Sequence, residues 1–188
     1  MTAVQVKITD DADDGYEGSI FGLSASDVAA GYGAFETEIA FFRFLNVTVP
    51  KGATIDSATL SLNITVVNGT PNTTLFGVDA DNAAAFANPD NLPSAATKTT
   101  ASADPDPAGT GTKVITITTI VQEIVDRAGW ASGSAMAFVV VNNAGSSDND
   151  WLAEDYVDVG TAEATLDITY TAGAASVPFR RSLLGVGF

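Results

Sequence analysis

The chain has 188 residues, of which 8 are Lys or Arg and 23 are Asp or Glu, so its formal net charge is −15. It has no His and no Cys, which excludes disulfides, thiolate nucleophiles, Cys-bound metal centres and Ser-His-Asp catalysis. Binding to nucleic acid or to an anionic membrane is not expected either, because both depend on clustered basic residues. We therefore predict that the protein is not an enzyme and has no catalytic residues.

Alternation of apolar and polar residues dominates the chain and predicts antiparallel strands. It is clearest in 55–67, where Leu60, Leu62 and Ile64 share one face and Thr59 and Ser61 share the other. We expect further strands at 4–8, 39–49, 73–78, 113–117, 135–141 and 164–170. The predicted core is Leu60, Leu62, Ile64, Phe42, Phe44, Phe138, Val140, Leu166 and Ile168.

Two strands, 39–49 and 135–141, are apolar on both faces, so we expect them to be central or covered by a second layer. One short helix is predicted near 119–127, because Thr119 and Gln122 have the spacing of a capping box before an apolar stripe. The Pro- and Gly-rich stretch 88–112 is predicted to be a long surface loop.

These elements predict an all-β fold, an antiparallel β-sandwich of jelly-roll type over residues 1–171. Residues 172–188 follow the last strand, fit no period and are predicted to form an extended C-terminal arm. The arm combines an adjacent basic pair with apolar residues, which is typical of a segment that docks on another subunit. The candidate partner-binding residues are Phe179, Arg180, Arg181, Leu183, Leu184 and Phe188.

Acidic residues cluster at 10–14 and at 148–155, one group after a predicted strand and the other before one. Their carboxylates are the hard oxygen ligands that Ca²⁺ prefers, so the two segments could meet and share a structural Ca²⁺ ion. The candidate ligands are Asp11, Asp13, Asp148, Asp150 and Asp155. The alternative is that these acidic loops only keep the protein soluble. We expect no other cofactor.

Carbohydrate binding would need exposed aromatic rings that stack on sugar faces. Trp151, in a polar stretch predicted to be a loop, and Tyr156 are the candidate sugar-binding residues. Trp130 follows the predicted helix and is expected to be a core residue.

Four stretches resemble one known family: F-F-R-F-L-N-V-T-V-P-K-G-A-T-I-D-S-A-T-L-S-L at 41–62, D-A-D-N-A-A-A-F at 79–86, I-V-Q-E-I-V-D-R-A-G-W-A-S-G-S-A-M-A-F at 120–138 and L-D-I-T-Y at 166–170. They are similar to the DNRLRE-type jelly-roll module, and the resemblance covers roughly residues 3–171. The Asp that follows R-F in that family is replaced here by Leu45. The resemblance implies a jelly-roll fold. It also implies one of two roles, a structural protein of tailed-phage particles or a carbohydrate-binding module.

We predict a non-enzymatic structural protein of a tailed-phage virion, most simply a capsid decoration or surface protein that docks on neighbouring subunits. Its expected partners are other virion proteins and copies of itself. No basic, apolar leader begins the sequence, so we expect it to be made in the host cytoplasm without secretion and to reside in the virion. The alternative is a carbohydrate-binding or adhesion module of a phage tail or bacterial surface.

Overall fold

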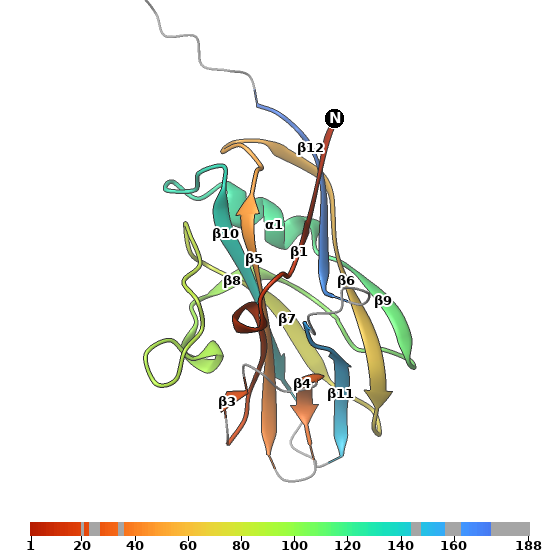
Figure 1. Ribbon diagram of the computed structural model, residues 1–188. Coiled ribbons are helices and arrows are strands. Elements are labelled where there is room, and N and C mark those ends of the chain that lie inside the picture. The colour runs from red at the N-terminus through yellow and green to blue at the C-terminus, as the bar shows by residue number, and fades with distance from the viewer. Residues whose placement is uncertain (20, 23–26, 34–35, 144–147, 157–162, 174–188) are drawn as a thin grey trace, which may run out of the picture.

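The computed structural model describes residues 1–19, 21–22, 27–33, 36–143, 148–156 and 163–173. The described strands follow one path, β1-β12-β6-β11-β4-β5-β10-β7-β8, with β9 beside β6 and with β2 paired to β5 and β3. Their pairings are antiparallel. The sheet curls over on itself, so that its two halves pack as the layers of a sandwich (Figure 1).

We call the two halves layer I and layer II. Layer I contains β1 (Thr2–Lys7), β4 (Asp27–Tyr32), β6 (Thr54–Val67), β9 (Gly111–Thr116), β11 (Asn149–Glu154) and β12 (Thr165–Thr171). Layer II contains β2 (Asp14–Glu17), β3 (Phe21–Gly22), β5 (Thr37–Val47), β7 (Thr73–Val78), β8 (Lys98–Ala103) and β10 (Ser134–Asn142). A short pairing of β4 with β5 joins the layers. The predicted all-β class, an antiparallel sandwich with one short helix, is therefore confirmed.

The core lies between the layers and is built from the inward faces of their long strands. Alternate residues of β6 point inward because the side-chain period of a strand is two. All nine residues predicted for the core are buried and belong to one apolar cluster: Phe42, Phe44, Leu60, Leu62, Ile64, Phe138, Val140, Leu166 and Ile168. The ring of Phe44 meets that of Phe138 edge to face, with 6.0 Å between the ring centroids.

The outer sides of β5 and β10 are apolar as well, and a second, smaller cluster covers them. Phe41 on β5 and Val139 on β10 pack there against Ala83 and Phe86, which belong to the segment that follows β7. The rings of Phe41 and Phe86 are tilted by 50°, with centroids 4.7 Å apart. The expectation that these two strands would be covered on both faces is thus confirmed, with a loop as the cover for this part of the outer side.

The helix α1 (Thr118–Val125) lies at the predicted place and buries Ile120, Val121, Ile124 and Val125. The predicted capping box is wrong. The helix begins after Ile117 without a side-chain cap, and Gln122 instead accepts a hydrogen bond from the Ile55 amide (2.8 Å) and donates one to the Ala53 carbonyl (3.1 Å). The Gln122 side chain therefore ties the helix to β6 rather than closing its first turn.

Two other predictions need correction. The stretch 88–112 is not one loop: it contains a 3₁₀ turn at Pro93–Ala95, the strand β8 and the first residues of β9. The region of Trp151 is not a loop either, because β11 runs through it and pairs with both β4 and β6. In both places polar and small residues obscured the strand pattern, and pairing with neighbouring strands overrides such weak local preference.

The sandwich ends with β12, and the described chain stops at residue 173. The predicted arm residues Phe179, Arg180, Arg181, Leu183, Leu184 and Phe188 lie outside the described residues. Among the described helices, none is long and apolar enough to cross a membrane.

Candidate functional site

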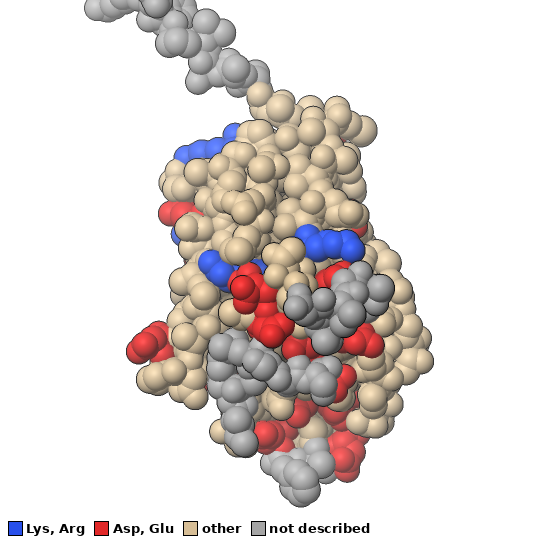
Figure 2. All heavy atoms as spheres, in the orientation of Figure 1, with Lys and Arg blue, Asp and Glu red and all other residues tan. Residues whose placement is uncertain are grey.

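Acidic side chains gather around β2, β4 and β11. Figure 2 shows them over the middle and lower part of the molecule, whereas Lys and Arg atoms lie in the upper half of that view. We call residues 10–17, 27–33, 36–38 and 148–156 the acidic half. Four of its carboxylates are buried: Asp13, Asp14, Asp150 and Asp155. A buried charge is costly unless it is paired or neutralised, so each of these groups needs a partner.

The segment 10–14 turns the chain from layer I to layer II. Asp10 caps a 3₁₀ turn, Asp11–Asp13, by accepting a hydrogen bond from the Ala12 amide at 2.9 Å. Asp13 forms an ion pair with Arg43 of β5, with 2.6 Å between Oδ1 and Nη1. Arg43 also donates from Nε to the Ala83 carbonyl at 2.9 Å, so one guanidinium joins the turn, β5 and the loop over the second cluster.

Asp14 and Asp155 form a different kind of pair, because no basic side chain in the described part of the chain forms an ion pair with either of them. Asp14 begins β2 and is fully buried, and Asp155 follows β11 and is 4% exposed. The backbone amide of Tyr156 donates to both carboxylates, at 3.1 Å to Asp14 Oδ2 and at 2.8 Å to Asp155 Oδ1. The other oxygen of Asp14, Oδ1, is buried without a hydrogen-bond partner.

Burial and mutual repulsion determine the protonation of this pair. Loss of water raises the pKa of Asp14 far above its ordinary value of 3.8, and the neighbouring Asp155 raises it further. Burial is also the main cause of the raised pKa of Asp155. Two buried carboxylates that interact directly resist carrying two charges, so the pair favours a shared proton or a bound cation.

A second acidic group lies at the other end of β11. Burial raises the pKa of Glu38 from 4.5 to about 7, and the charges of Asp150 and Glu36 add to the shift. Burial also raises the pKa of Tyr16, followed by the charges of Glu38, Glu36 and Asp27. Glu38 Oε2 is buried without a hydrogen-bond partner. Asp150 is supported differently, by the Asn68 amide group at 3.1 Å.

The structure distributes the five predicted Ca²⁺ ligands among different surroundings. Asp13 pairs with Arg43, Asp150 contacts Asn68, and Asp155 lies beside Asp14 at the opposite end of β11. Asp11 is exposed and lines a cavity of about 290 Å³ with Thr9, Asp10 and Tyr156, while Asp148 is exposed before β11. Among the described residues, no three acidic side chains lie close enough to hold one metal ion together.

Neither tryptophan offers a flat platform to a sugar. Trp151 is fully buried, with its indole nitrogen donating to Thr73 Oγ1 at 3.3 Å, so its prediction as an exposed stacking residue is wrong. Trp130 is a core residue as expected, and it donates to the Val49 carbonyl at 3.0 Å. Tyr156 is half-buried and lines the cavity beside Asp11.

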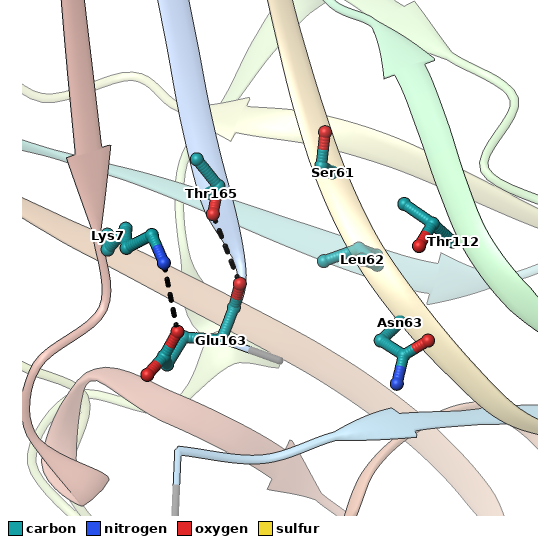
Figure 3. A pocket seen from close by; sticks show the side chains of 7 residues that line it. All are labelled: Lys7, Ser61, Leu62, Asn63, Thr112, Glu163 and Thr165. Atoms are coloured by element: carbon teal, nitrogen blue, oxygen red, sulfur yellow. Dashed lines mark hydrogen bonds and ion pairs between the residues drawn. The ribbon is translucent and has the colours of Figure 1, made fainter. Parts of the chain in front are cut away.

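A polar groove lies where β12 begins beside β6, and Figure 3 shows the side chains around it. Its volume is about 270 Å³, and its lining residues are Lys7, Ser61, Leu62, Asn63, Thr112, Glu163 and Thr165. Lys7 and Glu163 form an ion pair across its edge, with 3.3 Å between the charged atoms. On β6, pairing with β12 ends at Ser61 and pairing with β11 begins at Ile64, so the groove occupies the gap between two strands.

The outer face of layer I surrounds this groove and carries mainly short, uncharged side chains. Four strands align in rows, so that Gln5, Asp167, Thr59 and Thr116 lie next to one another in register. The outward residues of these strands are Ala3, Gln5, Lys7, Ser57, Thr59, Ser61, Asn63, Thr112, Val114, Thr116, Thr165, Asp167 and Thr169. The side-chain amide of Gln5 donates a hydrogen bond to the Asp167 carboxylate at 2.7 Å, so this carboxylate has a partner on the same face.

Sequence reasoning missed Asp14 and Glu38 as individual residues. Asp14 was part of an acidic run, and nothing in the run separates it from its exposed neighbours until β2 is recognised. Glu38 stands just before the apolar run that starts at Ile39, and a lone acidic residue at the start of a buried strand was the available signal.

Comparison with known proteins adds no family. No protein-family model matches the chain, and no curated protein matches it significantly. The similarity to the DNRLRE-type module therefore stays a prediction based on the four stretches.

Proposed function

We propose that the chain is a non-enzymatic structural protein of a tailed-phage virion. In this role it is a capsid decoration or surface protein that packs on neighbouring virion proteins and on copies of itself. The outer face of layer I is the observation that carries the proposal. Charged residues are depleted in the cores of protein interfaces, because burying a charge against a partner costs desolvation energy.

On this face the charged side chains of Lys7 and Asp167 already have partners within the same subunit. Lys7 pairs with Glu163, and Asp167 accepts a hydrogen bond from Gln5. Val114 adds an exposed apolar side chain, 57% of which is accessible. Around Thr59 and Thr116, a second subunit would cover mainly hydroxyl side chains and one carboxylate, that of Asp167, which keeps its hydrogen bond from Gln5.

The edges of layer I also support assembly. Among the described strands, β1 pairs with β12 and β9 pairs with β6, each on one side. An edge strand presents unpaired backbone groups that can pair with a strand of another chain. The predicted arm would add a third contact, and deleting 176–188 is expected to abolish incorporation into the assembly while leaving folding intact.

The test compares two matched pairs of arginine substitutions. The first pair, Thr59→Arg with Thr116→Arg, places charge on two residues that are paired in register on the outer face of layer I. The control pair, Thr100→Arg with Ser102→Arg, adds the same charge to exposed positions of β8 in layer II. Sedimentation velocity measures self-association, and co-sedimentation with virions lacking this protein measures docking. We expect the first pair to lose both and the control to keep both; equal behaviour of the two pairs would contradict an interface on this face.

The second candidate is a carbohydrate-binding or adhesion module of a phage tail or bacterial surface. The polar groove favours it, because Lys7, Asn63, Thr112 and Glu163 present donors and acceptors suited to sugar hydroxyls. The burial of Trp151 removes the stacking residue that such a module would use. A glycan array with the full chain separates the two functions: binding that is lost in Asn63→Ala supports this candidate, and a blank array supports the structural role.

A further inference from the structure

The buried pair Asp14 and Asp155 lies between the two layers, and its charge is not neutralised by any basic residue that the structure describes. Asp14 is in layer II and Asp155 follows β11 of layer I. Among the described residues, neither takes part in an ion pair, and the nearby Arg43 is engaged with Asp13 and the Ala83 carbonyl. The charge of Asp11 also acts on both carboxylates, which makes the surroundings more negative still.

One oxygen of the pair has no hydrogen-bond partner among the described residues. Asp14 is fully buried, its Oδ2 accepts from the Tyr156 amide, and its Oδ1 receives no hydrogen bond. Leaving a buried acceptor unsatisfied costs roughly 1–3 kcal/mol, and more when the group is charged. The Asp155 carboxylate beside it is itself an acceptor, so it cannot satisfy Asp14 unless a proton or a cation lies between them.

We propose that Asp14 and Asp155 bind one hard divalent cation, Ca²⁺ or Mg²⁺, between the two layers of the sandwich. Carboxylate oxygens are the protein ligands that both ions prefer, and Mg²⁺ in particular is often held by one or two carboxylates while keeping several waters. This arrangement fits a site where no three acidic side chains of the described chain converge. Water completes the coordination, with Asp11 attracting the ion from the cavity that it lines with Thr9 and Tyr156.

The site differs from the one predicted from sequence. Of those five candidate ligands only Asp155 binds the ion directly, and Asp14, which the sequence did not single out, supplies the second carboxylate. The inference does not depend on the proposed function, because a cation that joins the two layers would stabilise the fold in any role.

The test uses the full chain, freed of metal with EDTA and dialysed. Calorimetric titration with Ca²⁺ and separately with Mg²⁺ measures binding, and the melting temperature is followed with each ion. The variants are Asp14→Asn and Asp155→Asn, and the control is Asp90→Asn, which removes the same charge from an exposed loop position. Terbium luminescence gives a second signal, because the Tyr156 ring near the site can sensitise a bound Tb³⁺ ion.

We expect one ion per wild-type chain and a higher melting temperature with at least one of the two metals, since a ligand that binds only the folded state stabilises it. The control keeps this response. Asp14→Asn and Asp155→Asn lose it, yet in EDTA they melt at or above the wild-type temperature because the repulsion is gone. If one variant fails to fold, the metal response of the other variant and the terbium luminescence of the wild type still test whether the pair binds a cation. A wild-type melt unchanged by both metals would mean that a proton holds the pair together and would overturn the proposal, as would a full metal response in both variants.

Discussion

The central strands β5, β6, β10 and β12 and the acidic strands β2, β4 and β11 belong to the same sandwich but are stabilised differently. In the central strands, most of the stability comes from buried apolar side chains such as Leu62 and Phe138, which meet across the layers in contacts that involve no charge. In the acidic strands, carboxylates such as Asp14 and Asp150 are buried beside apolar neighbours and need particular partners. Apolar packing tolerates many neighbours, whereas a buried carboxylate depends on one or two contacts.

The largest effect is expected from a cavity in the central strands. Leu62 is 2% exposed, and Leu62→Ala should lower the free energy of unfolding by about 2–5 kcal/mol, measured by urea denaturation. Val114→Ala is the matched control, because Val114 is exposed on the neighbouring strand and its truncation should change stability by less than about 0.5 kcal/mol. Equal effects of the two substitutions would contradict the assignment of the inward and outward faces.

A smaller loss is expected when a buried carboxylate of the acidic half loses its partner. Arg43→Met leaves Asp13 buried without its ion pair, and the free energy of unfolding should fall by about 2 kcal/mol. Removing one partner of a fully buried ion pair costs roughly 3–5 kcal/mol. The effect expected here is smaller because 18% of the Arg43 side chain is exposed to solvent. The double variant Arg43→Met with Asp13→Asn should recover part of the loss. If the single variant is as stable as wild type in urea denaturation, Asp13 does not depend on Arg43.

The smallest effect should depend on pH. The pKa of Glu38 is raised to about 7 in the folded protein from 4.5, so the folded state holds this proton more tightly than the unfolded state does. The contribution of Glu38 to stability is therefore fully present below about pH 4.5 and is lost as the pH rises through about 7. Glu38→Gln should raise the melting temperature by about 2–4 °C at pH 8, corresponding to ~1 kcal/mol after allowance for solvent screening.

The same substitution should leave the melting temperature nearly unchanged at pH 4.5. Thr37→Val, at the exposed neighbouring position, is the control, and its effect should not vary with pH. A gain from Glu38→Gln that is equal at both pH values would show that the amide acts through packing rather than by removing a charge.

The sequence predicts the central strands well because their pattern has a physical cause. Residues 55–67 alternate between apolar and hydroxyl side chains, and β6 occupies Thr54–Val67 with that same alternation of burial. The strand at 73–78 was predicted at its observed bounds. In these strands each residue's surroundings follow from the period of the backbone, so local sequence is sufficient.

The acidic strands could not be predicted in this way. In β11, Asp150 and Trp151 are adjacent and both buried, because β11 lies between β4 and β6 and has little exposed surface. A local pattern cannot show this, since the buried carboxylate of Asp150 accepts a hydrogen bond from Asn68, 82 positions earlier in the chain. For the same reason the contact of Asp14 with Tyr156, 142 positions apart, emerges only from the fold.

We propose that this chain is part of the surface of a tailed-phage particle. The most direct measurement is electron microscopy of purified tailed-phage particles whose genome encodes the chain, labelled with a gold-conjugated antibody against the protein. We expect regular labelling of intact particles that is blocked by preincubation of the antibody with the purified chain. Unlabelled particles, with the protein found by immunoblot only in the supernatant of the same infected culture, would contradict it.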